Sequence, residues 1–137
     1  MAADSVRVHY QEELEQLEAS ALGGLDLVSA ALERTLEAVE HQDVELAQLV
    51  VADDDRIDGR YLEVHQALIT LLATQSPVAT DLRLISALLH VLKNVERMGD
   101  QCVNVCKLIP LTGRRPPADE EMVGKILAMG AQAGALI

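Results

Sequence analysis

Two pairs of acidic residues stand at mirrored positions on either side of one proline. Asp54 and Asp58 precede Pro77, and Glu96 and Asp100 follow it; the inner members lie 19 residues from the proline and the outer members 23. If the flanking segments are helices folded back on each other, all four carboxylates reach one level of the hairpin. Four like charges at one level repel one another, so wide spacing, water, basic neighbours or a metal cation must offset the repulsion.

Cation binding is one chemistry that this spacing allows. Carboxylates four residues apart on one helical face can ligate one ion or bridge two, and hard cations prefer oxygen ligands. The two pairs occupy like-handed edges of their helices, so they either face each other across the groove or both face away. The competing interpretation is an ordinary solvated acidic face, neutralised by Arg56, Lys93 and Arg97.

The composition points to an all-α protein without a nucleic-acid site. The chain has 137 residues, half of them apolar, with no Phe or Trp and two Tyr, so its core must consist of aliphatic side chains. Its net charge of −11 opposes binding to nucleic acid or to anionic lipid. The same charge makes free phosphate a poor direct ligand and favours a partner protein with a basic surface.

Three long helices account for most of the chain and predict an antiparallel three-helix bundle over residues 5–110. Apolar residues at helical spacing place them at about 5–40, 44–75 and 78–108. The break before the second helix is short, which predicts antiparallel neighbours. Pro77 ends the second helix because the residue before proline disfavours helical geometry.

Polar residues near the breaks are the expected helix caps. Ser5 is the expected N-cap of the first helix and Asp43 that of the second, whereas Ser76 or Thr80 caps the third. The pair Gly23-Gly24 inside the first helix marks either a kink or a close contact between helices.

A short linker and a partial helix follow the bundle. Residues 111–117 are rich in Pro and charge and are predicted to be the linker. Residues 118–137 are predicted to be the opening helix of a second, truncated unit, with an apolar face that is left unpaired. That exposed face makes self-association, most simply a homodimer, the expected behaviour of the chain.

The two cysteines are interpreted as buried thiols rather than ligands. Cys102 and Cys106 lie one helical turn apart on an apolar face, so we expect small buried hydrophobes in a reducing, cytoplasmic environment. The first 16 residues contain no apolar signal core, and the apolar tail with Lys125 is too short to span a bilayer. Any association with a membrane is expected to occur through partner proteins.

Three ordered segments resemble the PhoU family of phosphate-transport regulatory proteins. They are HQDVELAQLVVADDDRID, LLATQSPVATDLRLIS and NVERMGDQCVNVCKL, and the resemblance covers about residues 9 to 109. The resemblance implies that this chain contains the first of the family's two three-helix repeats, followed by the start of the second. The position before Val95 is often Asp in the family but is Asn94 here, so one acidic group is absent.

The resemblance implies a regulator rather than a catalyst. Such proteins are cytoplasmic negative regulators of phosphate uptake and of the phosphate-starvation response, which couple a phosphate ABC transporter to a sensor histidine kinase. Family members carry multinuclear metal sites, so a divalent or iron cluster (Fe, Zn or Mg) is implied at Asp54, Asp58, Glu96 and Asp100. Asn104, one turn beyond Asp100, is an additional helper.

Three functional hypotheses follow from the sequence. The first is a docking module whose acidic helices bind a kinase or a transporter component. The second is a carboxylate-bridged metalloenzyme on a helical bundle, which would need an open coordination position and a dry pocket. The third is a helical dimerisation piece with a solvated acidic face. No nucleophile–histidine pair with a recognisable signature and no glycine-rich phosphate loop supports other catalysis.

Overall fold

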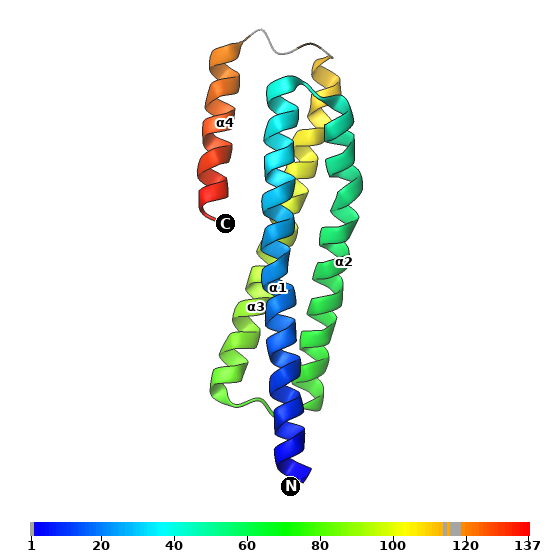
Figure 1. The fold of residues 1–137 in the computed structure, drawn as a ribbon, viewed down its shortest axis with the longest axis vertical. Coiled ribbons are helices and arrows are strands. Elements are labelled where there is room, and N and C mark those ends of the chain that lie inside the picture. The colour runs from blue at the N-terminus through cyan, green and yellow to red at the C-terminus, as the bar shows by residue number, and fades with distance from the viewer. Residues whose placement is uncertain (1, 114, 116–118) are drawn as a thin grey trace.

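The computed structural model is an antiparallel helical bundle, which confirms the predicted all-α class. It describes residues 2–113, 115 and 119–137, and in this part of the chain all regular structure is helical. Helices α1 (Ala2–His41), α2 (Val44–Thr74) and α3 (Ala79–Leu108) pack side by side along their length. Figure 1 shows α4 (Glu120–Ala135) lying beside the C-terminal half of α1.

The aliphatic side chains form two buried clusters, one at each end of the bundle. The cluster near the α2–α3 turn, called the turn-proximal core, consists of Tyr10, Leu14, Ala21, Val64, Leu68, Leu71, Ile85, Leu88 and Leu92. The cluster at the other end, called the turn-distal core, consists of Val28, Ala31, Ala38, Val44, Ala47, Val50, Ile57, Val95, Cys102, Cys106 and Ile109. All three long helices contribute to both clusters, so burial of apolar area aligns them over their full length.

Of the caps predicted for the three long helices, only that of α2 is confirmed. Asp43 is its N-cap, and its carboxylate accepts a hydrogen bond from the Leu46 backbone N–H at 2.9 Å. The predicted Ser76 or Thr80 cap of α3 is wrong: the N-cap is Val78, and no side chain caps the helix. Pro77 explains this shift, because it helps to hold the chain extended up to the first residue of α3. The predicted Ser5 cap is also wrong, since α1 already begins at Ala2 and no proline or glycine interrupts it there.

The glycine pair of α1 serves a close contact between helices. The helix runs through Gly23 and Gly24 without a break. A Cβ added at Gly24 would lie 3.2 Å from Cγ1 of Val95, and one added at Gly23 would lie 3.0 Å from the Arg60 guanidinium. Of the two interpretations offered by the sequence, close approach of α1 to its neighbours is the one that the structure supports.

The α1–α2 corner is tied to the end of α3 by one buried amide. Helix α3 ends at Leu108 as predicted, and the chain continues through Pro110 as a short 3-10 helix, η1 (Ile109–Thr112). Gln42 takes a positive φ of 52° at the corner, and its side-chain amide donates to the carbonyl oxygens of Ile109 and Gly113, both at 2.7 Å. The predicted linker therefore begins inside η1, and its residues 114, 116 and 117 lie outside the described residues.

The fourth helix is packed on one side only. Asp119 is its N-cap, close to the predicted start. Gly130 lies directly against the Leu36 side chain of α1, where an added Cβ would overlap it, and Ile137 packs against the turn-distal core. The apolar face predicted to be unpaired is therefore partly covered by α1, while its other side remains exposed. Among the described residues, no helix combines the length and hydropathy that a membrane crossing requires.

Candidate metal centre

Three of the four mirrored carboxylates meet between α2 and α3. Oxygen atoms of Asp54, Asp58 and Asp100 all lie within 4.8 Å of one another. Asp54 is half-buried, whereas Asp58 is exposed at the rim of the groove. The two acidic pairs thus face each other across the hairpin, which is the arrangement that a shared cation needs.

Gly99 creates the space in which Asp54 lies. This glycine is buried on α3, and a Cβ added there would lie 3.0 Å from Oδ1 of Asp54 and 3.2 Å from Cδ1 of Ile57. Any larger residue would push α2 away from α3 at this level. The missing side chain therefore brings the Asp54 carboxylate close to the α3 backbone and to Asp100.

The electrostatics of the cluster favour an added positive charge. Partial burial, and after it the nearby carboxylates of Asp58 and Asp100, together raise the pKa of Asp54 to about 6. The pKa of Asp100 is also raised, first by burial and then by the charge of Glu96. Proximity of like charges disfavours their ionised forms, so these acids hold a proton more tightly than a free aspartate does.

Glu96 lies outside the group of three. Its carboxylate accepts a hydrogen bond from the Lys93 ammonium at 2.9 Å, and this bond lowers the pKa of Glu96. Lys93 also lies 5.7 Å from the centroid of the Tyr61 ring, which places the cation between the two helices. Glu96 still interacts with Asp100, so it borders the cluster without pointing into it. Asn104, the predicted helper, is exposed one turn further along α3.

An ion pair from α1 flanks the cluster and was not anticipated. Arg34 donates a hydrogen bond to Oδ2 of Asp53 at 2.7 Å, and both residues line a cavity of about 10 Å³ beside Asp54. Neither Arg56 nor Arg97 makes an ion pair among the described residues, so Lys93 is the one predicted neutraliser that does. Spacing along the α2–α3 hairpin carries no information about α1, which is why Arg34 was missed.

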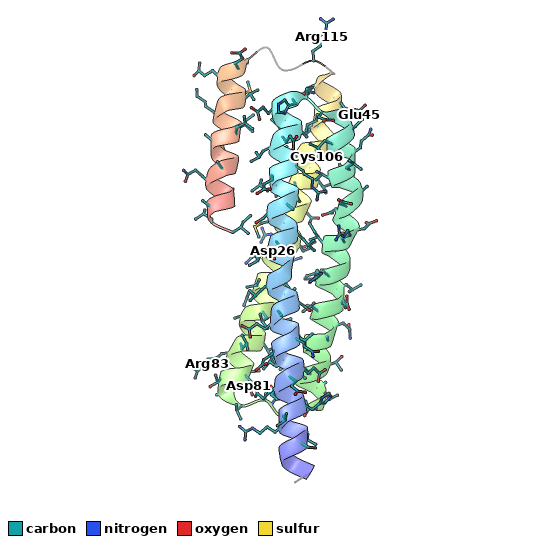
Figure 2. All side chains as sticks on the ribbon, in the orientation of Figure 1. Asp26, Glu45, Asp81, Arg83, Cys106 and Arg115 are labelled. Carbon is teal, nitrogen blue, oxygen red and sulfur yellow. The ribbon has the colours of Figure 1, made fainter. Side chains whose placement is uncertain are left out.

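The two cysteines belong to the buried core rather than to the carboxylate cluster. Both are free and buried, and burial raises the pKa of each thiol. Thr35 lies 3.5 Å from Sγ of Cys106, close enough for a hydrogen bond across the turn-distal core. Figure 2 shows Cys106 near one end of the bundle and Asp81 and Arg83 near the other, beside the α2–α3 turn. Buried thiols with raised pKa values behave as small apolar side chains.

Comparison with known proteins places these features in a family. The family described as PhoU domain matches residues 25–109, which include both acidic pairs. The chain is 33% identical over 106 residues to the "Phosphate-specific transport system accessory protein PhoU homolog" of Aquifex aeolicus, covering 77% of this chain and 48% of that protein. It is 31% identical over 130 residues to the protein of the same name from Clostridium acetobutylicum, covering 93% and 58% respectively.

A protein of Serratia marcescens, named "Phosphate-specific transport system accessory protein PhoU", is 30% identical over 98 residues, which cover 72% of this chain and 40% of that protein. The chain thus spans about half the length of the curated relatives it matches. More than half of its residues fall within the family match, including the turn at Pro77 and the carboxylates on either side. The chain therefore belongs to the PhoU domain family.

Proposed function

We propose that this protein is an accessory component of phosphate transport that acts by docking on other proteins. In this role it is a cytoplasmic negative regulator of phosphate uptake and of phosphate-starvation signalling, with a sensor histidine kinase and components of a phosphate ABC transporter as its partners. The observation that carries the proposal is the family match over residues 25–109, together with relatives whose names describe phosphate-transport accessory proteins.

The surface chemistry is consistent with a docking role. The bundle is long and narrow, and 22 acidic residues against 11 basic ones give it a negative surface along its length. Such a surface attracts a basic partner over a distance and speeds encounter, and salt weakens the attraction. A kinase or ATPase subunit with a basic face would meet this requirement.

The carboxylate cluster is proposed to bind a hard metal cation. Asp54, Asp58 and Asp100 are the ligands that the geometry supports best, and Glu96 becomes a fourth if Lys93 releases it. The donor set fits the group, because carboxylate oxygens suit Mg²⁺, Fe²⁺ or Zn²⁺. The pKa of Asp54 is raised first by burial and then by the neighbouring carboxylates, whose charge a cation would offset. A bound cation would supply positive charge and cross-link α2 to α3.

Titration calorimetry of chelator-treated protein tests the metal proposal directly. The probes are MgCl₂, FeCl₂ under nitrogen, and ZnCl₂, each added to the wild type and to Asp54→Asn/Asp100→Asn. Loss of at least about tenfold in affinity is expected for the double variant, because two of three charged ligands become neutral. The control Glu12→Gln/Glu63→Gln removes two exposed acids elsewhere and should bind as the wild type does. Equal metal affinity in all three proteins would refute the proposed site.

Pull-down with the cognate kinase and transporter ATPase tests the docking proposal separately. Retention should fall as salt rises, because the attraction is between surface charges. Absence of binding to either partner, with and without metal, would refute docking even if calorimetry had found a metal site.

A carboxylate-bridged metalloenzyme has weaker support. The cavity beside Asp54 has a volume of about 10 Å³, which is room for no more than one water molecule. Metal-dependent hydrolase or oxidase turnover that disappears in Asp100→Asn would nevertheless favour this alternative over a regulator.

A further inference from the structure

An open pocket lies between the N-terminal part of α1 and the turn that joins α2 to α3. It has a volume of about 380 Å³, against the roughly 10 to 15 Å³ that one water molecule needs. Figure 1 shows α1 running past this turn and extending beyond it. Three helices therefore contribute to the wall: α1 provides Arg7 and Tyr10, α2 provides Thr74, and α3 provides Asp81 next to its N-cap Val78. The pocket has room for the side chain of another molecule.

One polar atom at this pocket lacks a partner. Tyr10 is 7% exposed, and its hydroxyl is buried without a hydrogen-bond partner within bonding distance among the described residues. Burial, and after it the charge of Asp81, raise the pKa of Tyr10, so Asp81 is the acid that lies nearest in effect to this hydroxyl. Buried polar groups without a partner are uncommon in folded proteins because they cost stability. One that borders a pocket indicates a site that a ligand completes.

The charge at the inner wall of the pocket is negative. Asp81 is half-buried and takes part in no ion pair among the described residues. The last turn of α2, which ends at the pocket with Thr74, carries no basic side chain to offset the negative end of the helix. Arg7 also lines the pocket, but it is exposed and does not pair with Asp81. With a net charge of −11 on the whole chain, these acceptors favour a cation that carries several hydrogen-bond donors.

From this arrangement we infer that the pocket binds an arginine side chain of a partner protein, with Asp81 as its anchor. That the arginine belongs to a protein rests on the docking role proposed above. A guanidinium matches a carboxylate through two parallel hydrogen bonds. The carboxylate of Asp81 has acceptor sites for these bonds and for one from Tyr10, so a bound arginine also completes the buried hydroxyl. Val6 and Val78, 57% and 53% exposed at the pocket, can cover the apolar neighbours of the arginine.

An NMR titration of isotope-labelled protein tests the pocket without any partner protein. The probe is the blocked peptide Leu-Ala-Arg-Ala-Leu, and the control peptide carries citrulline, which has the shape of arginine without its charge. The amide signals of Tyr10 and Asp81 should shift as the arginine peptide is added. The citrulline peptide should bind at least about tenfold more weakly, because its bonds to the carboxylate lack the positive charge. Equal affinity for the two peptides, or unchanged signals with both, would overturn the inference.

Four variants locate the site and the sign of its charge. Asp81→Asn should bind the arginine peptide at least about tenfold more weakly. Asp26→Asn is the matched control, because it makes the same charge change at an exposed position half-way along α1, labelled in Figure 2, and it should bind as the wild type does. Tyr10→Phe should bind about fivefold more weakly without losing stability, since it removes one hydrogen bond to Asp81. Arg7→Gln should bind at least as well as the wild type, because it removes a competing cation.

An anion site would give the opposite results. Arg7→Gln would then lose binding, and inorganic phosphate would shift the same amide signals at lower concentration than the arginine peptide does. Either result would overturn the inference, as would equal affinity of Asp81→Asn and the wild type.

The pull-down with kinase and transporter ATPase separates this inference from the docking proposal. If a partner is retained by the wild type, Asp81→Asn should lower its retention and Asp26→Asn should not. Unchanged retention by Asp81→Asn would overturn the pocket as the docking site while docking itself stands. If neither partner is retained but the arginine peptide binds through Asp81, the docking proposal fails and the pocket stands as an arginine site.

Discussion

Replacing Asp54 with asparagine should stabilise the metal-free protein. Burial and the carboxylates of Asp58 and Asp100 raise the pKa of Asp54 from 3.8 to about 6, a difference of about two pH units. At about 1.4 kcal/mol per unit, the ionised form costs the folded state up to about 3 kcal/mol. Solvent screening at this partly exposed site reduces that figure, so we expect a gain of about 1 to 2 kcal/mol in Asp54→Asn.

The sign of the pH dependence follows from the raised pKa. Below the unfolded value of 3.8 the carboxyl is protonated in both states and contributes nothing. As pH rises from 3.8 to about 6, the unfolded state loses its proton first, so the contribution of Asp54 to stability falls. Above about 6 the full cost is present. The advantage of Asp54→Asn should therefore be greatest in mildly alkaline buffer and should vanish in acid.

Urea denaturation followed by circular dichroism, with chelator present, measures this difference at a series of pH values. Glu63→Gln is the control, because it removes one charge from an exposed position on the same helix and reports the general benefit of lowering the net charge. A gain for Asp54→Asn no larger than that of the control, or one that does not change with pH, would refute the reasoning. Added metal should reverse the order of stability, so that the wild type becomes more stable than Asp54→Asn, because the metal stabilises the wild type alone.

Three further changes test the scaffold by the same denaturation method. Gln42→Leu should cost about 1 to 3 kcal/mol, because it removes the buried hydrogen bond from the Gln42 amide to the Ile109 carbonyl; an unchanged midpoint would contradict the proposed tie between the α1–α2 corner and the end of α3. Asp43→Ala should cost about 1 kcal/mol through loss of the α2 cap to Leu46, and Asp43→Asn should restore most of it. Tyr10→Phe should be neutral or stabilising, since its buried hydroxyl has no hydrogen-bond partner within bonding distance among the described residues. A clear loss would show that the hydroxyl donates to the nearby Asp81, whose charge helps to raise the pKa of Tyr10 after burial does.

The parts of the fold that follow from periodicity were predictable from the sequence. The helical stripes placed all three long helices to within a few residues, because amphipathic segments this long have one way to bury their apolar sides. Mirror placement about Pro77 put the carboxylates at one level. The facing arrangement was one of two options left open, and Gly99 is the residue that allows it.

Features that depend on contacts between distant segments were not predictable. The Arg34–Asp53 ion pair joins α1 to α2, and no local pattern links these residues. Glu96 matches the motif as well as Asp100 does, yet Lys93 draws its carboxylate away from the group of three. The cap of α3 was missed because a proline before a helix can hold the chain extended without a side-chain cap, as it does at Val78.

The buried core is divided into two clusters, with a boundary between them part of the way along the bundle. On α2 the turn-distal core ends at Ile57 and the turn-proximal core resumes at Val64. Gly23, Gly24 and Gly59 fall at or near this level, and each costs a helix interior up to about 1 kcal/mol relative to alanine. Asp54, Asp58 and Asp100 come from positions close to this level on α2 and α3. Repulsion among these acids therefore acts at the level where the two clusters of the core meet, and a bound cation would relieve it there.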